Sequence, residues 1–229
     1  MKILAIGAHP DDIEIFMFGL LLLLKKRGDK IFLAVATDGS LGGVDYKNSL
    51  VKKRKKETIE GLKELEKPYF FNFPDGKLGY KSYHKLLLHD YIYNIKPDLI
   101  VTHHKNDYHA DHRALSNIIE SISGHNIPVI YCDTMMGLNF DPMYYVDITS
   151  VFKLKKKAVL CHESQNPERF INLIETMNGY RSAQCNSPIG TFAESYSFKK
   201  SFPFTDLRCF LPASPKLRKF DIKKNNGFL

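Results

Sequence analysis

Short apolar runs alternate with helical segments along most of the chain, and this alternation limits the folds that the chain can adopt. The apolar runs are residues 2–7, 31–36, 69–73, 99–103 and 128–132. Helices are predicted at residues 13–26, 48–66, 82–95 and 109–122, with two more near 151–161 and 167–181. Strands that alternate with helices favour a parallel sheet, and continuously apolar strands are typical of a sheet covered on both faces. We therefore predict an α/β, Rossmann-like fold with a mostly parallel sheet and helices on both faces.

The length of 229 residues suits one domain, which we expect to span residues 1–229. Beyond about residue 184 the periodicity is lost. Residues 186–204 are expected to hold an extended hairpin, and the basic tail from about residue 212 is expected to be loose.

The chain carries a net charge of +8, which nucleic acid, a membrane surface or an anionic small molecule could exploit. The basic residues are scattered, so a solvated Lys-rich surface is favoured. In the run of residues 52–56, Lys52, Lys53 and Lys56 point away from the predicted apolar face of their helix. We expect no nucleic-acid partner.

The four cysteines include no C-x-x-C pair, which argues against a cysteine-built zinc site and fits a reduced, cytoplasmic location. The apolar stretch at residues 15–24 is about half the length of a membrane span. No dinucleotide-binding G-x-G-x-x-G motif follows the first strand, and no P-loop motif occurs. We expect a small-molecule substrate and no membrane span, and a homo-oligomer remains open.

Two clusters of histidine and aspartate each begin where a predicted strand ends. The first is residues 8–14, Ala-His-Pro-Asp-Asp-Ile-Glu, and the second is residues 103–112, His-His-Lys-Asn-Asp-Tyr-His-Ala-Asp-His. Ligands of open α/β sheets bind beyond the carboxyl ends of the strands. The two clusters are therefore expected to meet in one site.

These residue types are suited to a metal centre. Two imidazoles and one carboxylate leave a zinc ion a fourth position for water, and a second carboxylate can take the proton of that water. Asp11 and Asp12 offer one ligand and one base, while His109 and His112 would share one helix face. Helix capping is the alternative role for the aspartates, but two clusters at matching strand ends favour a site. His103 and His104 are expected to be structural or to support the ligands.

Residues 8–14 and 109–112 resemble the A-H-P-D-D-x-E and H-x-D-H motifs of the LmbE/PIG-L family of zinc-dependent N-deacetylases, with Ala110 where proline is common. Weaker likenesses follow in the family's order at residues 37–40, 54–57, 74–76, 162–165 and 193–196. The resemblance covers roughly residues 1–200.

The resemblance implies a role for each of eight residues. The implied metal ligands are His9, Asp12 and His112, and the implied general base is Asp11. His109 would stabilise the oxyanion or protonate the leaving amine, and Asp111 would orient a histidine. Arg54 and Asp75 match positions that hold the sugar or its aglycone.

The expected activity is removal of the N-acetyl group from an N-acetylglucosamine-type conjugate, giving acetate and a free amino sugar. The expected cofactor is Zn²⁺, although His and Asp ligands also accept Fe²⁺ or another divalent ion. One alternative is an amidase or deformylase acting on another amide, such as a nucleotide-linked amino sugar or an antibiotic precursor. The other is a non-catalytic protein that binds metal or carbohydrate.

Overall fold

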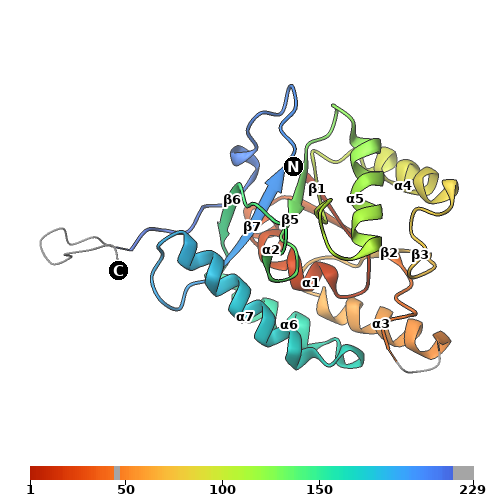
Figure 1. Cartoon of the computed structure of the whole chain (residues 1–229), viewed down its shortest axis with the longest axis horizontal. Helices are drawn as coiled ribbons and strands as arrows, with labels where there is room; N and C mark the ends of the chain where they lie inside the picture. The colour runs from red at the N-terminus through yellow and green to blue at the C-terminus, as the bar shows by residue number, and fades with distance from the viewer. Residues whose placement is uncertain (44–46, 219–229) are drawn as a thin grey trace, which may run out of the picture.

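A computed structural model describes residues 1–43 and 47–218 of the chain. This part contains a seven-stranded sheet with the strand order β3-β2-β1-β4-β5-β7-β6 (Figure 1). The strands are β1 (Lys2–Gly7), β2 (Lys30–Thr37), β3 (Tyr69–Phe73), β4 (Leu99–Thr102), β5 (Val129–Cys132), β6 (Tyr144–Asp147) and β7 (Ala193–Phe198). The first five strands are parallel to one another, and β7 runs antiparallel to both β5 and β6. The predicted α/β fold with a mostly parallel sheet is confirmed.

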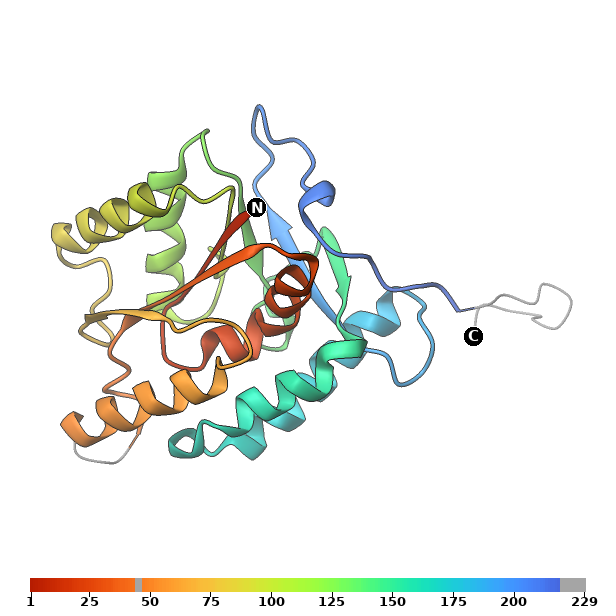
Figure 2. The same cartoon turned by 180° about the vertical axis from the view of Figure 1, so that it is seen from behind.

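Helices cover both faces of the sheet, as the front and back views show (Figures 1 and 2). They are α1 (Asp12–Phe16), α2 (Phe18–Arg27), α3 (Lys47–Gly61), α4 (Ser82–Ile95), α5 (Ala110–Ser123), α6 (Phe152–Leu160) and α7 (Pro167–Gln184). Helices α4 and α5 bury leucine and isoleucine side chains against one face of the sheet. Helices α1, α2, α6 and α7 pack on the other face and form the larger core.

The strand order reverses at β1, which pairs with β2 on one side and with β4 on the other. The chain therefore leaves these neighbouring strands toward opposite sides of the sheet, which opens a crevice beyond their carboxyl ends. The histidine and aspartate clusters that follow β1 and β4 both begin at this crevice.

The single helix predicted at residues 13–26 is wrong, because the chain breaks at Met17 into α1 and α2. The carboxylate of Glu194 on β7 accepts hydrogen bonds from the backbone N–H groups of Gly19 (2.8 Å) and Leu20 (2.7 Å). The N–H groups in the first turn of a helix have no hydrogen-bond acceptor within the helix. In α2, the Glu194 carboxylate supplies this acceptor. Because Glu194 is far from this stretch in the sequence, the local pattern of apolar residues could not predict the break.

The extended hairpin expected at residues 186–204 is also wrong. This segment supplies the single strand β7, which pairs with β5 and with β6 instead of with a neighbour inside the segment. Strand β6 was not predicted. Its four residues, Tyr144–Asp147, end in an aspartate and are mostly half-buried, so they lack the continuous apolar run that identified the equally short β4 and β5.

The expectation of a loose tail concerns residues from about 212, of which 219–229 lie outside the described residues. The described part of this tail contacts the fold. The backbone N–H of Arg218 donates to the carbonyl of Asn186 (3.0 Å), and the carbonyl of Ala213 accepts from the N–H of Asp147 (3.1 Å). Within residues 1–43 and 47–218, no helix is both long and apolar enough to cross a bilayer.

Candidate metal centre and active site

The two clusters meet at the crevice, where the first turns of α1 and α5 lie close together (Figure 1). His9 Nδ1 lies 3.3 Å from His112 Nε2 and 3.4 Å from Asp12 Oδ2. His112 Nε2 lies 3.3 Å from Asp12 Oδ1. The three side chains that the sequence singled out as ligands thus form a compact triangle of nitrogen and oxygen atoms.

The spacing of this triangle fits a bound metal ion. An ion with bonds of about 2.0–2.1 Å and tetrahedral geometry separates its ligands by about 3.3 Å. Potential ligand atoms also lie within 4.8 Å of one another in three overlapping groups: His9, His109 and His112; Asp12, His103 and His112; His9, Asp75 and Asp111. The donor set therefore fits a divalent ion such as Zn²⁺.

Other carboxylates hold the ligand histidines in place. Asp107 Oδ2 lies 3.1 Å from His112 Nδ1, which leaves His112 Nε2 directed at the triangle. Asp111 Oδ2 lies 3.3 Å from His9 Nε2, and the same carboxylate accepts the backbone N–H of Gly76 (2.8 Å). Such contacts fix the orientation of metal-binding imidazoles. The orienting position predicted for Asp111 thus has a counterpart in Asp107, for which the sequence predicted no such contact.

His103 and His104 occupy different surroundings. His103 is buried, stacks on His112 with ring centroids 3.7 Å apart, and places Nε2 3.0 Å from Asp12 Oδ2. Burial and the neighbouring His112 charge lower the pKa of His103 to about 4, so its ring is neutral. His104 instead packs edge-on against Tyr131 and Phe140, away from the triangle.

Asp11 is held in a strained backbone conformation, with φ at 120°. Residues other than glycine rarely adopt such angles, and they persist where the surroundings enforce them, often at active sites. Here the Arg54 guanidinium donates to the carbonyl of Pro10 (2.6 Å) and to Asp11 Oδ2 (3.1 Å). Asp11 lines the cavity that also contains the triangle.

The two adjacent aspartates differ in their affinity for protons. Burial raises the pKa of Asp11, although the Arg54 charge opposes the rise. Burial acts the same way on Asp12, but the charges of His112 and His103 outweigh it and hold the pKa of Asp12 well below its usual range. Asp12 therefore stays ionised as a ligand would, whereas Asp11 is the better proton acceptor.

His109 precedes α5 and faces the same centre. Its Nδ1 accepts a hydrogen bond from the backbone N–H of Asp111 (3.3 Å), and burial together with the charges of His9 and His112 lowers its pKa. A neutral imidazole whose Nδ1 accepts a hydrogen bond carries its proton on Nε2. His109 can therefore donate a hydrogen bond through Nε2.

These groups line a cavity of about 510 Å³, a volume suited to a small ligand. The residues that line it include His9, Asp11, Asp12, Arg54, Asp75, His109 and His112. Arg54 and Asp75, which were predicted to bind substrate, line this cavity but are already engaged. Arg54 bonds to Gly39, Pro10 and Asp11, and Asp75 accepts the N–H of Leu41 and contacts His9.

Sequence reasoning assigned no role to four residues in or near this site. Glu14 and His162 form a buried pair (2.9 Å) behind the crevice, in which the charge of Glu14 raises the pKa of His162 despite its burial. Gln165 and Arg169 also line the cavity. The motif at residues 162–165 was the available signal for His162 and Gln165, whereas nothing distinguishes Arg169 from other surface arginines.

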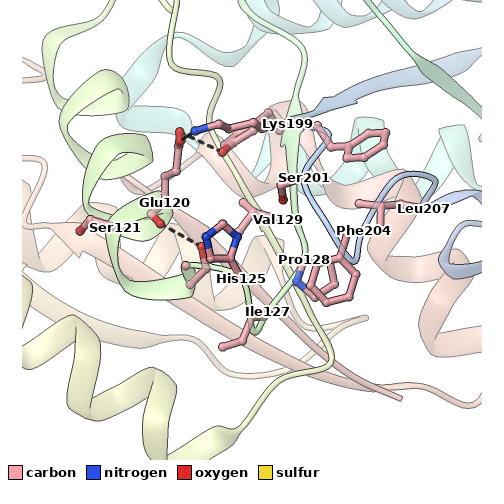
Figure 3. Close-up of a pocket in the computed structure, with 14 residues that line it drawn as sticks. Glu120, Ser121, His125, Ile127, Pro128, Val129, Lys199, Ser201, Phe204 and Leu207 are labelled. Carbon is pink, nitrogen blue, oxygen red and sulfur yellow. Dashed lines mark hydrogen bonds and ion pairs between the residues drawn. The ribbon is translucent and has the colours of Figure 1, made fainter.

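A second cavity, of about 330 Å³, lies near the opposite ends of the strands, where β5 begins and β7 ends (Figure 3). Its charged groups are paired with each other, since Lys199 Nζ lies 2.6 Å from Glu120 Oε1. Tyr131 also donates to Glu120 (3.4 Å). None of the ligand triangle lines this cavity, so the crevice at β1 and β4 is the candidate active site.

The fold and the site together define an α/β protein with a histidine and aspartate centre, able to hold a metal ion, beyond the carboxyl ends of β1 and β4. Residues 4–123, just over half of the chain, match the sequence model of the PIG-L family, described as GlcNAc-PI de-N-acetylase. The chain therefore belongs to the PIG-L family, and the resemblance drawn from its motifs is confirmed.

Similar proteins include deacetylases and an enzyme of another class. Diacetylchitobiose deacetylase of Thermococcus kodakarensis is 28% identical over 192 residues, which cover 73% of this chain and 71% of that protein. The structure of N,N'-diacetylchitobiose deacetylase from Pyrococcus horikoshii superposes with a TM-score of 0.75 at 24% identity, covering 89% of this chain and 87% of that one. GalB, a 4-carboxy-2-hydroxymuconate hydratase from Pseudomonas putida, reaches 0.74 at 18% identity, covering 90% and 99%. At these identities the structures establish a shared fold.

Proposed function

We propose that the protein is a metal-dependent hydrolase that removes the N-acetyl group from an N-acetylglucosamine-type conjugate. The observation that carries this proposal is the position of Asp11, whose carboxylate lines the same cavity as the His9, Asp12 and His112 triangle. The family match and the deacetylase names of its relatives support acetamide as the bond that is cleaved.

His9, Asp12 and His112 would hold the ion. When bound, a divalent ion such as Zn²⁺ lowers the pKa of water and polarises a carbonyl group. The contacts of Asp107 with His112 and of Asp111 with His9 keep the ligand nitrogens aimed at one point.

The protein side chains supply the proton transfers. Asp11 accepts a proton from the water that attacks the acetamide carbonyl, because its raised pKa makes it a stronger base than Asp12. Neutral His109 donates a hydrogen bond from Nε2 to the oxygen that becomes negative. The proton held by Asp11 then passes to the departing nitrogen. One water and one amide thus give acetate and a free amine.

Release of the carboxylic acid from a panel of acylated amines, acetate from N-acetyl and formate from N-formyl compounds, tests this proposal. The panel holds N,N'-diacetylchitobiose, other N-acetylglucosamine conjugates, N-formyl analogues and N-acetylated amines without a sugar. We expect acetate from the sugar conjugates with Zn²⁺-loaded protein. Asp11→Asn should lower turnover by roughly 10²- to 10⁴-fold, the usual contribution of a general base, while metal content stays unchanged.

The control is Asp90→Asn, which makes the same carboxylate-to-amide change at an exposed position on α4. It should leave turnover unchanged. Full activity of the Asp11→Asn variant would exclude Asp11 as the base. A metal-loaded wild type that releases acid from no compound would instead leave a metal-binding protein without this activity.

A further inference from the structure

Gln165 lines the same cavity as the ligand triangle but takes no part in the proposed proton transfers. It ends η3 (Glu163–Gln165), a short helix between α6 and α7. Gln165 is buried, and its Nε2 donates a hydrogen bond to the Ser164 hydroxyl (3.1 Å). Among the residues that the structure describes, none donates to Gln165 Oε1, and this oxygen stays accessible. Gln165 therefore has a free acceptor to offer to a ligand.

The orientation of this amide follows from a carboxylate that cannot donate. Glu57 on α3 is buried and accepts two hydrogen bonds from Ser164, one from the backbone N–H (2.8 Å) and one from the hydroxyl (2.5 Å). A serine hydroxyl carries a single proton, and here that proton is directed at Glu57. The Ser164 oxygen can then only accept from Gln165, so the Gln165 NH₂ group must face it. The carbonyl oxygen is consequently the end of the amide that faces away from Ser164.

The neighbours of Gln165 Oε1 also favour an oxygen at this position. A Cβ atom added to Gly42 would stand 3.2 Å from Gln165 Oε1 and 2.2 Å from Arg54 Nη1, so the three residues meet at one point. All three line the cavity. The positive guanidinium favours the negative end of the amide dipole beside it. Because Gly42 has no side chain, it leaves this oxygen uncovered.

We propose that Gln165 is a specificity-determining residue whose amide oxygen accepts a hydrogen bond from a hydroxyl group of the substrate sugar. Ser164 and Glu57 are positioning residues, because they set which end of the amide faces the ligand. The inference rests on the proposed function for the identity of the ligand as a sugar. A site built around a fixed acceptor selects ligand groups that can donate a proton and rejects groups that can only accept one.

Fluorinated analogues of an N-acetylglucosamine conjugate test this assignment. Each analogue replaces one sugar hydroxyl by fluorine, which cannot donate. For one analogue, kcat/KM with Zn²⁺-loaded protein should be about 3- to 10-fold below that of the parent, the effect of losing a hydrogen bond between uncharged groups. Gln165→Met, which removes the acceptor, should lower the parent to the level of that analogue. Gln184→Met makes the same change at an exposed position outside the cavity and should keep the wild-type ratio.

Glu57→Gln tests the positioning role, because it reverses the order of the protons at nearly constant volume. The new amide can donate to the Ser164 hydroxyl oxygen, which frees the hydroxyl proton to point at Gln165. The Gln165 amide then turns its NH₂ group toward the ligand. Hydroxyl and fluorine can both accept from NH₂, so the ratio of parent to analogue should fall below about twofold. Ser164→Thr, which retains the hydroxyl, should keep the wild-type ratio.

A purely structural role for Glu57 gives a different result. Glu57→Gln would then lower the activity toward parent and analogue alike and leave their ratio unchanged. That outcome, or a wild type that treats the parent and every analogue equally, would overturn the proposal.

Failure of the proposed function is a separate result. A wild type that releases no acetate would contradict that function, and calorimetric binding of the same parent and analogues to Zn²⁺-loaded protein then replaces kinetics. Weaker binding of one analogue than of the parent, with the difference lost in Gln165→Met and in Glu57→Gln, would support the role of Gln165. Equal affinity for the parent and every analogue, including no binding of any, would overturn it.

Discussion

At the residue scale, the site depends on two adjacent aspartates whose pKa values are shifted in opposite directions. Asp11 and Asp12 are adjacent, yet burial raises the pKa of Asp11 while the surrounding imidazoles lower that of Asp12. The sequence predicted this pair, together with His9 and His112, because the residue types and their positions after strands point to metal chemistry. It could not predict the role of Asp107. That role depends on how the loop after β4 curls to bring a carboxylate to His112 Nδ1.

Asp107→Asn tests this orienting contact. The amide removes the negative charge from His112 Nδ1, so the imidazole should be held less firmly and be a weaker ligand. We expect Zn²⁺ affinity to fall roughly 10- to 100-fold, the usual effect of losing such a contact, measured by competition with a chromogenic chelator. Asp141→Asn, at an exposed position, serves as the matched control. Unchanged affinity in the Asp107 variant would remove this residue from the centre.

At the element scale, one buried ion pair connects α2, α6 and β7. Lys155 on α6 is fully buried and lies 2.7 Å from Glu194 Oε1 on β7, while Glu194 also accepts the N–H groups at the start of α2. The sequence predicted a helix near residues 151–161, where α6 lies, and one helix at residues 13–26 in place of α1 and α2. It did not predict the break at Met17, because the carboxylate that stabilises the new helix start is far away along the chain.

Lys155→Met should destabilise the protein by roughly 3–5 kcal/mol, because it leaves the Glu194 charge buried without a cation. Urea unfolding measures this free energy, and Lys153→Met, at an exposed position on the same helix, gives the comparison. The double variant Lys155→Met/Glu194→Gln should recover part of the loss, since no charge then remains buried. Equal unfolding free energies for Lys155→Met and Lys153→Met would show that the ion pair contributes nothing.

At the scale of the whole molecule, the parallel part of the sheet was predictable and its antiparallel edge was not. Strands such as β1 and β4 can be predicted from the sequence because both of their faces are buried, which makes nearly every residue in them apolar. Strands β6 and β7 are different, since β7 includes the buried polar residues Glu194 and Ser195. Their pairing depends on contacts between parts of the chain that are distant in sequence, and the local periodicity of apolar residues cannot predict such contacts.

Metal binding should stabilise the whole fold, because the ligands come from the segments that follow two separate strands, at and before the starts of α1 and α5. With free Zn²⁺ at about 100 times its dissociation constant, the gain is about 2.7 kcal/mol. That gain corresponds to a rise of roughly 5–10 °C in Tm for a chain of this size. His112→Ala should abolish the rise in a thermal scan, whereas His125→Ala, at an exposed position near the second cavity, should retain it. An equal rise in both variants would place the ion elsewhere.

The position of β7 between β5 and β6 has a consequence for synthesis on the ribosome. Strand β6 joins the sheet through β7, which emerges about fifty residues later. Until then, β6 has no strand beside it and the start of α2 lacks the carboxylate of Glu194. The nascent chain can thus assemble β1 to β5 early, whereas closing this end of the molecule must wait for its last strand.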